Sequence, residues 1–526
     1  MIIVAFLLLL LVVLVPLVNH YKDPKGLRRF PTPSFWALTP LWAAYHNWHG
    51  RRFLAVDEAH RRRGPVLRLG PEHLSFASPG AYKEIYGHGS AIIKDVFYDN
   101  LAGKNPAMAN TSSRPLHSER RKAVSAIFAA KHVSSMEPKV QYSVEKLLYA
   151  IQAKAEGRMV STSDEYPANN GVFDLRPWMN MFSFDAFSNM MWSSCYNFLD
   201  RGNDSCFAMD HKGAVTTVNA MKTFQSGVHW NTICAQFSPP IYSLGRWLTS
   251  STADKQAADH FAGMARYLTV QRIKMKPEEP DFFTNLPYDE ASEKSRTTLN
   301  IDQLVAECDT YLNAGNDTTQ ISLTNTMFEL ASHPEKQQKL YDILLQGLPE
   351  SSRPVASYTE LCQIPYLRAV LDESFRLLPP VRFGLLRRTT GHGATISGHT
   401  IPAGVTVSSS VYTMHRDSNL FHNPSEWIPE RWLPDTHHVS DAERQNLKDY
   451  VLPFTLGGRA CIGRNLAYME LSICVAAMVL SFEWTITPEA KKSFTHYERF
   501  NSSPVCLMIS AKARCDEKLS SEWNSS

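Results

Sequence analysis

The chain has 526 residues, of which 44% are hydrophobic and 20% are charged, and its formal net charge is +3. This length accommodates one large domain or several average ones, and the ordinary apolar fraction predicts a globular protein with a sizeable core. The nearly neutral charge, with no basic stripe interleaved with aromatic residues, disfavours a nucleic-acid partner.

The nine cysteines are irregularly spaced, and their odd number leaves at least one unpaired. No Cys-x-x-Cys pair occurs, which disfavours a structural zinc site of the usual spacing. This pattern is typical of a chain in a reducing, cytosolic environment and not of a fold held by disulfides.

An uncharged apolar run covers residues 1–18. As a helix it would span ~27 Å, about the hydrocarbon thickness of the endoplasmic reticulum bilayer. A cleaved signal peptide is the alternative, but no basic stretch precedes the run and no Ala-x-Ala-like site follows it. By the positive-inside rule, the cations that follow predict a single-pass transmembrane anchor with the rest of the chain in the cytosol. These cations are Lys22, Lys25, Arg28 and Arg29.

The next segment, residues 19–44, contains Pro24, Pro31, Pro33 and Pro40 and is predicted to be a stiff, non-helical hinge. Residues 45–515 show no internal repeat and no low-complexity tract, and we expect them to form one domain. Residues 516–526 are predicted to be a polar tail.

Hydrophobic periodicity predicts that this domain is mainly α-helical with a small β-rich region. The segments with helical periodicity are 117–155, 253–275, 301–333, 335–346, 366–378 and 464–481. Strand-like stretches cover 66–69, 74–77, 385–389, 395–396 and 405–410. No Gly-x-Gly-x-x-Gly sequence opens a helix after a strand, so a redox enzyme built this way would need electrons from another protein.

The cysteine most suited to chemistry is Cys461, in the segment 454–463. It precedes a predicted helix that begins at Arg464, whose N-terminal N–H groups and dipole would stabilise a thiolate. Gly457 and Gly463 are expected to adopt positive φ and to allow close backbone approach.

This segment fits Phe-x-x-Gly-x-Arg-x-Cys-x-Gly at all fixed positions and resembles the haem-binding signature of the cytochrome P-450 family. The resemblance implies that Cys461 is the proximal iron ligand of haem b. Phe454 would cover its sulfur, and Arg459 would pair with a haem propionate. A thiolate opposite the oxygen site favours O–O cleavage, which is the chemistry of a monooxygenase.

Two upstream segments resemble a structural network of the same family. Glu373-Ser-Phe-Arg376 looks like its Glu-x-x-Arg motif, and a spacing of three places both side chains on one helix face. Pro429-Glu-Arg431-Trp432 resembles the partner segment. The resemblance implies a buried Glu–Arg–Arg network of Glu373, Arg376 and Arg431 that positions the cysteine loop.

The segment Ala314-Gly315-Asn316-Asp317-Thr318-Thr319 resembles the oxygen-activating motif of the family. Ala314, Gly315 and Thr318 share one helix face, so small residues and a hydroxyl lie together. The resemblance implies that Thr318 donates a hydrogen bond to dioxygen and that Asp317 relays protons from solvent. The alternative is a threonine bonded to its own helix backbone.

His117-Ser-Glu-Arg-Arg121 resembles the propionate-binding helix, although most members have Trp at the first position. Arg388 stands where the family often has another propionate-binding arginine, with the adjacent Arg387 as the alternative. Arg382 is a candidate contact for a polar group on the substrate. The alternatives for Arg382 are a propionate contact or a side chain turned to solvent.

Taken together, the resemblance covers roughly residues 30–510 and implies a single cytochrome P-450-type domain that inserts one atom of dioxygen into an apolar organic substrate. A separate NADPH–cytochrome P-450 reductase and an endoplasmic reticulum membrane are the implied partners. The overall sequence resembles filamentous-fungal members of the family, many of which tailor secondary metabolites. Two alternatives remain, a haem-thiolate isomerase or dehydratase and a non-catalytic haem binder. The intact Asp317-Thr318 pair disfavours the first, because such chemistry has no use for a proton relay.

Overall fold

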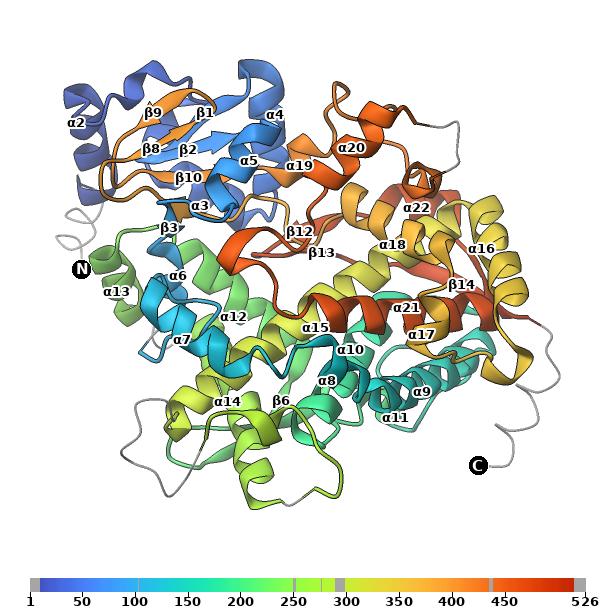
Figure 1. Cartoon of the computed structure of the whole chain (residues 1–526). Coiled ribbons are helices and arrows are strands. Elements are labelled where there is room, and N and C mark those ends of the chain that lie inside the picture. Colours follow the sequence, from blue (N-terminus) through green and yellow to red (C-terminus); the bar gives the residue numbers. More distant parts are fainter. Residues whose placement is uncertain are drawn as a thin grey trace.

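Helices form most of the molecule, and small sheets lie beside them (Figure 1). The computed structural model describes residues 10–102, 104–248, 252–275, 277–288, 299–434 and 439–514. The longer helices are α2 (Val15–Lys22), α3 (Leu41–Trp48), α4 (Arg52–Arg63), α5 (Pro79–Tyr86), α7 (Arg114–Val124), α9 (Glu137–Ala155), α10 (Leu175–Trp192), α12 (Ala220–Cys234), α13 (Pro239–Leu248), α14 (Ala253–Lys274), α15 (Ile301–Ser332), α16 (Pro334–Gly347), α18 (Pro365–Leu377), α20 (Asp441–Tyr450) and α21 (Arg464–Ser481). The short helices are α6 (Phe97–Ala102), α8 (Ala130–Ser134), α11 (Phe198–Arg201), α17 (Tyr358–Leu361), α19 (Val411–Met414) and α22 (Pro488–Ser493).

The strands are β1 (Val66–Gly70), β2 (His73–Phe76), β3 (Ile93–Lys94), β4 (Val172–Asp174), β5 (Ser205–Met209), β6 (Val215–Asn219), β7 (Arg387–Arg388), β8 (Ala394–Ile396), β9 (His399–Ile401), β10 (Thr406–Ser409), β11 (Phe482–Thr485), β12 (His496–Glu498), β13 (Ser502–Pro504) and β14 (Met508–Ala513). The largest sheet has the order β1-β2-β10-β7-β3. In it, β10 runs parallel to β2, and Arg387 of β7 pairs with Val407 of β10. This order places β7 between β10 and β3.

The longest helix, α15, crosses the middle of the molecule and packs against α10, α14 and α21 (Figure 1). A capping box starts it: Asn300 Oδ1 accepts a hydrogen bond from Gln303 N at 2.9 Å, and Gln303 Oε1 accepts one from Asn300 N at 3.2 Å. The next helix begins at Pro334, whose ring disfavours helical conformation in the residue before it. Neighbouring helices cover α15, and Asn316, Asp317 and Thr319 of its motif are buried.

The sequence predicted five of the long helices closely. The segments 253–275, 301–333, 335–346, 366–378 and 464–481 correspond to α14, α15, α16, α18 and α21. A single helix over 117–155 was wrong, because the segment is divided into α7, α8 and α9. Pro138 lies in the first turn of α9, where proline favours a new helix start. The periodicity also missed α10, which is buried on nearly all sides and so lacks a polar face.

Part of the predicted anchor, residues 1–9, and the predicted tail at 516–526 lie outside the described residues. Residues Leu10–Leu14 form a π-helical turn that continues into α2, so the helix ends at Lys22 and not at residue 18. Within the described ranges, α21 is the one helix both long and apolar enough to cross a membrane. It lies in the protein core, whereas the apolar helix at Leu10–Lys22 is shorter.

The hinge prediction needs a correction, because residues 19–44 are partly helical and pack against the sheet region. Single 3-10 turns form at Leu27–Arg29 and Phe35–Leu38, and α3 begins at Leu41. The Lys25 ammonium lies 2.6 Å from a carboxylate oxygen of Glu72 beside β2. Buried apolar side chains in this segment account for its attachment, since their removal from water stabilises the contact.

Candidate functional site

The cysteine loop, residues 454–463, curls directly before α21. The backbone N–H of Cys461 donates to the carbonyl of Phe454 at 2.9 Å. Gly457 has a φ of +72°, and a Cβ there would lie 2.4 Å from the carbonyl oxygen of Tyr86, so this position requires glycine. Gly463 differs from the prediction: its φ is −83°, because it caps α21 and does not turn the chain.

The Cys461 side chain lines a cavity that reaches the middle of α15. Burial among protein atoms raises the pKa of its thiol, whereas the N–H of Gly463 and the charges of Arg121 and Arg464 lower it. The start of α21 and the two cations thus offset part of the effect of burial, but the pKa of the Cys461 thiol stays above its ordinary value. Coordination to a bound metal cation would deprotonate the thiol.

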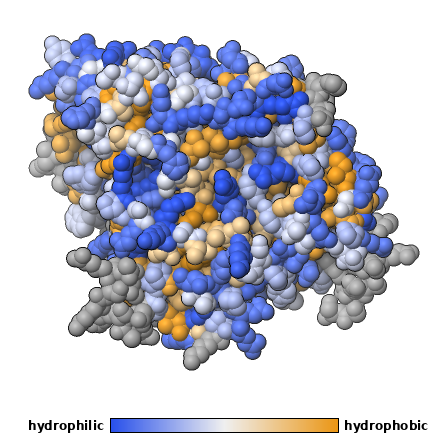
Figure 2. All heavy atoms as spheres, viewed as in Figure 1, coloured by the Kyte–Doolittle hydropathy of each residue, from blue (hydrophilic) through white to orange (hydrophobic). Residues whose placement is uncertain are grey.

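The walls of this cavity, which we call the cysteine cavity, are mostly aromatic and aliphatic. Ala314, Gly315 and Thr318 of α15 line it, as Cys461 does. Its other lining residues include Phe128, Phe187, Tyr311, Phe375, Val381, Leu385, Phe454 and Leu466. Such a slot excludes water and suits a flat apolar ligand. On the face seen in Figure 1, most of the surface is hydrophilic and apolar side chains gather near its middle (Figure 2).

Gly315 has a second packing role that the sequence did not reveal. A Cβ at this position would lie 2.5 Å from the ring of Phe187 on α10. The missing side chain therefore lets Phe187 reach the cavity wall next to Thr318. The small residue serves the contact between α10 and α15 as well as the cavity.

Thr318 and Asp317 face different surroundings on α15. The Thr318 hydroxyl lines the cysteine cavity. It donates a hydrogen bond to the Ala314 carbonyl at 2.7 Å, which is the bond to its own helix backbone that the sequence left as the alternative. The Asp317 carboxylate is buried and accepts hydrogen bonds from Asn501 at 2.7 Å and Gln320 at 3.0 Å. Burial raises the pKa of Asp317, while these hydrogen bonds and two nearby arginines lower it.

The two arginines near Asp317 connect it to the protein surface. Arg176 and Arg499 line a second cavity together with His229 and Tyr497. Two arginines of this cavity, which Asp174 and Asp254 also line, thus act electrostatically on the buried Asp317. This arrangement suits the relay role that the sequence suggested.

Glu470 of α21 was missed by the sequence analysis. It is buried, lines the cysteine cavity and accepts a hydrogen bond from Thr319 Oγ1 at 3.4 Å. Burial raises the pKa of Glu470 to about 8. The signal was present in the sequence, because Glu470 is the single acidic residue in the otherwise apolar helix 464–481. Leu466 and Glu470 are one turn apart and so share the cavity face.

A third cavity, the basic cavity, lies beside the cysteine loop. Its basic lining residues are His88, Lys94, Arg114, His117, Arg121, Lys122, Arg387 and Arg459, and no Asp or Glu lines it. No ion pair joins any of these side chains to a carboxylate within the described ranges. Burial and the nearby arginines lower the pKa of His117 to about 4 and that of Arg459 to about 10. The cavity therefore lacks negative charge, which a ligand with carboxylates would supply.

Three of the predicted propionate-binding residues, His117, Arg121 and Arg459, line this basic cavity. Arg388 does not line it. Successive residues of β7 point to opposite faces, so Arg387 turns to the basic cavity while Arg388 turns toward Glu72 and Asp95. Lys94 also belongs to this set and was missed; its ammonium lies 4.0 Å from the ring centre of Tyr98.

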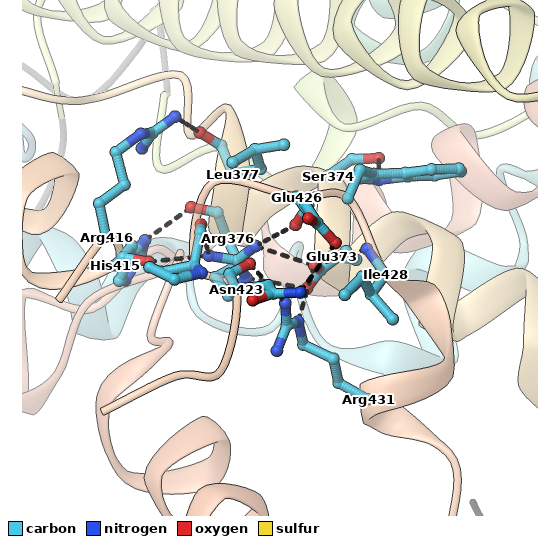
Figure 3. A network of polar contacts seen from close by, with 12 residues as sticks. Glu373, Ser374, Arg376, Leu377, His415, Arg416, Asn423, Glu426, Ile428 and Arg431 are labelled. Atoms are coloured by element: carbon cyan, nitrogen blue, oxygen red, sulfur yellow. Dashed lines mark hydrogen bonds and ion pairs between the residues drawn. The ribbon is translucent and has the colours of Figure 1, made fainter. Parts of the chain in front are cut away.

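The predicted Glu–Arg–Arg network forms at the end of α18 (Figure 3). Arg376 donates two hydrogen bonds of 2.9 Å to the two carboxylate oxygens of Glu373, and Arg431 Nε donates to the same carboxylate at 3.1 Å. All three side chains are buried. Arg431 also donates to Glu443 of α20 at 2.6 Å, a contact that the sequence did not indicate. The network thus joins α18 to the helix that precedes the cysteine loop.

Arg382 does not line the cysteine cavity, so the structure gives its predicted substrate contact no support. Its Nε donates to the carbonyl of Pro379 at 3.0 Å, and its guanidinium lies over the rings of Phe53 and Tyr412. It is 2% exposed, so a side chain turned to solvent is also excluded. The neighbouring Val381 takes the position on the cavity wall.

These features fit an iron porphyrin with two carboxylates. Cys461 supplies a sulfur donor, the apolar walls suit the ring, and the basic cavity offers unneutralised cations for the acidic groups. In haem-thiolate proteins a cysteine ligates the iron, and the polarity and accessibility of the pocket on the opposite side of the haem decide the chemistry.

A family model for cytochrome P450 matches residues 29–505 of the chain. Benzoate 4-monooxygenase bphA of Aspergillus niger is 29% identical over 97% of both chains. Cytochrome P450 monooxygenase atr2 of Stereocaulon alpinum is 28% identical over 90% of this chain and 87% of its own. The crystal structure of a cytochrome P450, CYP102L1, has the same fold, with a TM-score of 0.70 and 19% identity over 92% of this chain and 99% of that one. The chain therefore belongs to the cytochrome P450 family, and its named relatives are monooxygenases.

Proposed function

We propose that this chain is a haem b monooxygenase that inserts one atom of dioxygen into an apolar organic substrate. The observation that carries the proposal is that the Cys461 sulfur and the Thr318 hydroxyl line one largely apolar cavity. A thiolate-ligated haem supplies the chemistry of oxygen reduction and O–O cleavage when it is bound.

The side chains around this cavity have distinct tasks in the proposal. The aromatic walls exclude water and hold an apolar substrate. The Thr318 hydroxyl holds a proton at the cavity wall, and Asp317 would relay protons to it from solvent. Arg176 and Arg499 stay charged and favour the ionised form of Asp317. Glu470, whose pKa is raised to about 8, retains its proton at neutral pH and keeps the wall uncharged.

Electrons would come from a separate NADPH–cytochrome P450 reductase. The P450 match occupies residues 29–505, so these residues form no flavin or nicotinamide domain. We also propose that the anchor at residues 1–22 holds the protein in the endoplasmic reticulum membrane, with the catalytic domain in the cytosol. Exposed Leu11, Leu14 and Val15 support a membrane contact, as does the basic stretch that follows α2.

The similarity to fungal monooxygenases, among them poxM of Penicillium oxalicum at 27% identity, supports a role in fungal secondary metabolism. A comparison of metabolites from a deletion strain and its parent tests this role. Accumulation of an apolar precursor in the deletion strain supports it, and identical metabolite profiles contradict it.

The reaction class is tested with the purified haem protein, the reductase and NADPH under isotope-labelled dioxygen. We expect one labelled oxygen atom per product and NADPH consumption that depends on substrate. Product formed without NADPH would instead indicate a haem-thiolate isomerase or dehydratase. Haem binding without turnover of any metabolite from the native host would favour a non-catalytic haem binder.

The anchor is tested by deleting residues 1–22. We expect the shortened protein to leave the membrane fraction to a large extent and to keep its haem, since the cysteine loop lies far along the chain. Extraction of the intact protein by alkaline carbonate would contradict an integral anchor.

A further inference from the structure

A short turn joins β12 to β13 and reaches α15 at Asp317. Glu498 and Ser502 are the paired residues on either side of the turn, so the connection between them is three residues long. Within it, the N–H of Arg499 donates to the carbonyl of Asn501 at 2.9 Å. Asn501 is 7% exposed, so its side chain points into the protein and not to solvent.

Two contacts hold this turn against the rest of the molecule. The Phe500 ring packs edge-on against Phe383, with 5.4 Å between the ring centres. Directly after the turn, the N–H of Ser502 donates to the carbonyl of Pro380 at 2.7 Å. Pro380 lines the cysteine cavity. The turn is therefore attached to the cavity wall, and the backbone that carries Asn501 is fixed with it.

The Asn501 amide is directed at the Asp317 carboxylate. Its Nδ2 donates to Asp317 Oδ2 at 2.7 Å, the shortest of the side-chain hydrogen bonds to this carboxylate. Gln320 and Ser503 donate to the other oxygen, Oδ1, at 3.0 and 3.4 Å. Asn501 Oδ1 has no partner in the described ranges. The contact with Asp317 is thus the side-chain hydrogen bond that this buried amide makes there.

The surroundings of Asp317 act on its charge in opposite directions. Burial raises its pKa, and the hydrogen bond from Asn501 is the largest of the effects that lower it. The hydrogen bond from Gln320 and the charges of Arg176 on α10 and Arg499 in the turn lower the pKa further. A relay group must both take up and release a proton, and a buried carboxyl group without donors would keep its proton. The donors from α15 and from the turn therefore keep Asp317 usable as a relay.

We propose that Asn501 is a positioning residue for proton delivery, whose amide holds the Asp317 carboxylate in place and keeps it able to release its proton. In each cycle Asp317 passes one proton toward Thr318 and takes one from solvent, so its charge is restored and no electron moves. Asn501 acts through Asp317, since it does not line the cysteine cavity. This inference rests on the proposed monooxygenase function and specifies how its proton supply is set.

The first experiment is a double-mutant cycle of Asp317→Asn and Asn501→Leu in the full-length haem protein with its reductase and NADPH. No organic substrate is added. Reduction of dioxygen to water needs protons for O–O cleavage and consumes twice as much NADPH as release of peroxide, so the stoichiometry separates the two products. The ratio of water to peroxide should fall roughly tenfold in Asn501→Leu, the effect of losing one charge-assisted hydrogen bond. In the Asp317→Asn background the same substitution should have no further effect.

Infrared titration of the same protein gives a reading that does not depend on turnover. Protonated carboxyl groups absorb apart from carboxylates, and the band that Asp317→Asn removes belongs to Asp317. In Asn501→Leu the midpoint of this band should move to higher pH, because the lost hydrogen bond favoured the ionised form. The control is Asn446→Leu, which removes a hydrogen bond of 3.0 Å to the Leu420 carbonyl and should leave the midpoint unchanged.

The inference is overturned if the midpoint is unchanged in Asn501→Leu, or if this substitution lowers the ratio of water to peroxide equally with and without Asp317. The second result would make Asn501 a structural residue of the turn. Should Asn501→Leu fail to fold, Asn501→Asp keeps the shape and replaces the donor with a second carboxyl group. Its midpoint should also rise, and an unchanged midpoint overturns the inference.

Failure of the proposed function is distinguished from failure of this inference. An unchanged ratio in Asp317→Asn would remove the relay role of Asp317 and the inference with it. A lowered ratio in Asp317→Asn together with a normal ratio in Asn501→Leu would overturn the inference alone. The experiment with labelled dioxygen tests the monooxygenase reaction separately, and the infrared midpoint does not depend on its result.

Discussion

Glu373, Arg376 and Arg431 form a network in which each charged group has hydrogen-bond partners, whereas no carboxylate of the described residues lines the basic cavity or forms an ion pair with its cations. Both regions are near the cysteine loop. In the first, opposite charges satisfy one another and hold two segments together. In the second, burial and the neighbouring like charges lower the pKa of basic groups, as for His117 and Arg459. Complete pairing thus marks a structural network here, and incomplete pairing marks a binding site.

Substitution of Cys461 gives the largest expected effect. Cys461→Ser should abolish the thiolate-type spectrum of the reduced carbonyl complex, and product formation should fall to the assay background. Cys474→Ser is the matched control, since Cys474 is buried in the core of α21 and does not line the cysteine cavity. A normal spectrum in Cys461→Ser would contradict the assignment of the iron ligand.

The paired network should be costly to break. Arg376→Leu leaves the buried Glu373 carboxylate with fewer partners, and we expect a loss of about 3–5 kcal/mol in the free energy of unfolding. Denaturant unfolding of the haem protein measures this loss. The control is Arg62→Leu, which breaks an exposed ion pair with Glu58 and should cost ~0–1 kcal/mol. Equal losses in both variants would show that burial of the network does not matter.

Oxygen chemistry should depend on the hydroxyl at the cavity wall. In Thr318→Ala, haem and substrate should still bind, while product formation falls roughly 100-fold, the lower end of what a positioned proton donor contributes. Product per NADPH should drop and peroxide release should rise. Thr324→Ala removes a similar backbone-bonded hydroxyl outside the cysteine cavity and should keep normal coupling. Unchanged coupling in Thr318→Ala would assign the proton transfer to another group, with Glu470 as the first to examine.

The smallest expected effect separates two adjacent arginines. Arg387→Met should speed the transfer of haem to an acceptor protein by roughly tenfold, which corresponds to about 1.4 kcal/mol for one charge-assisted contact. Arg388→Met should leave haem transfer unchanged, because Arg388 turns to Glu72 and Asp95. The reverse result would restore the original assignment of Arg388 and would mean that incomplete pairing is a poor guide to the binding site.

Local spacing in the sequence was sufficient for the parts of the fold and site that lie within one element. The helices α15, α18 and α21 follow from apolar periodicity over many turns, and Glu373 and Arg376 share a face because three residues separate them. The segment 454–463 identified the cysteine because several residue types recur there at fixed spacing. These features depend on neighbours along the chain.

Contacts between distant segments could be decided only by the tertiary structure. The choice between Arg387 and Arg388 depends on which face of β7 the sheet turns to the basic cavity. The direction of Arg382 depends on the rings of Phe53 and Tyr412, and that of Glu470 on the position of α15 against α21. Side-chain spacing within one strand or helix is set by backbone geometry alone, whereas the partner that each face meets is set by packing.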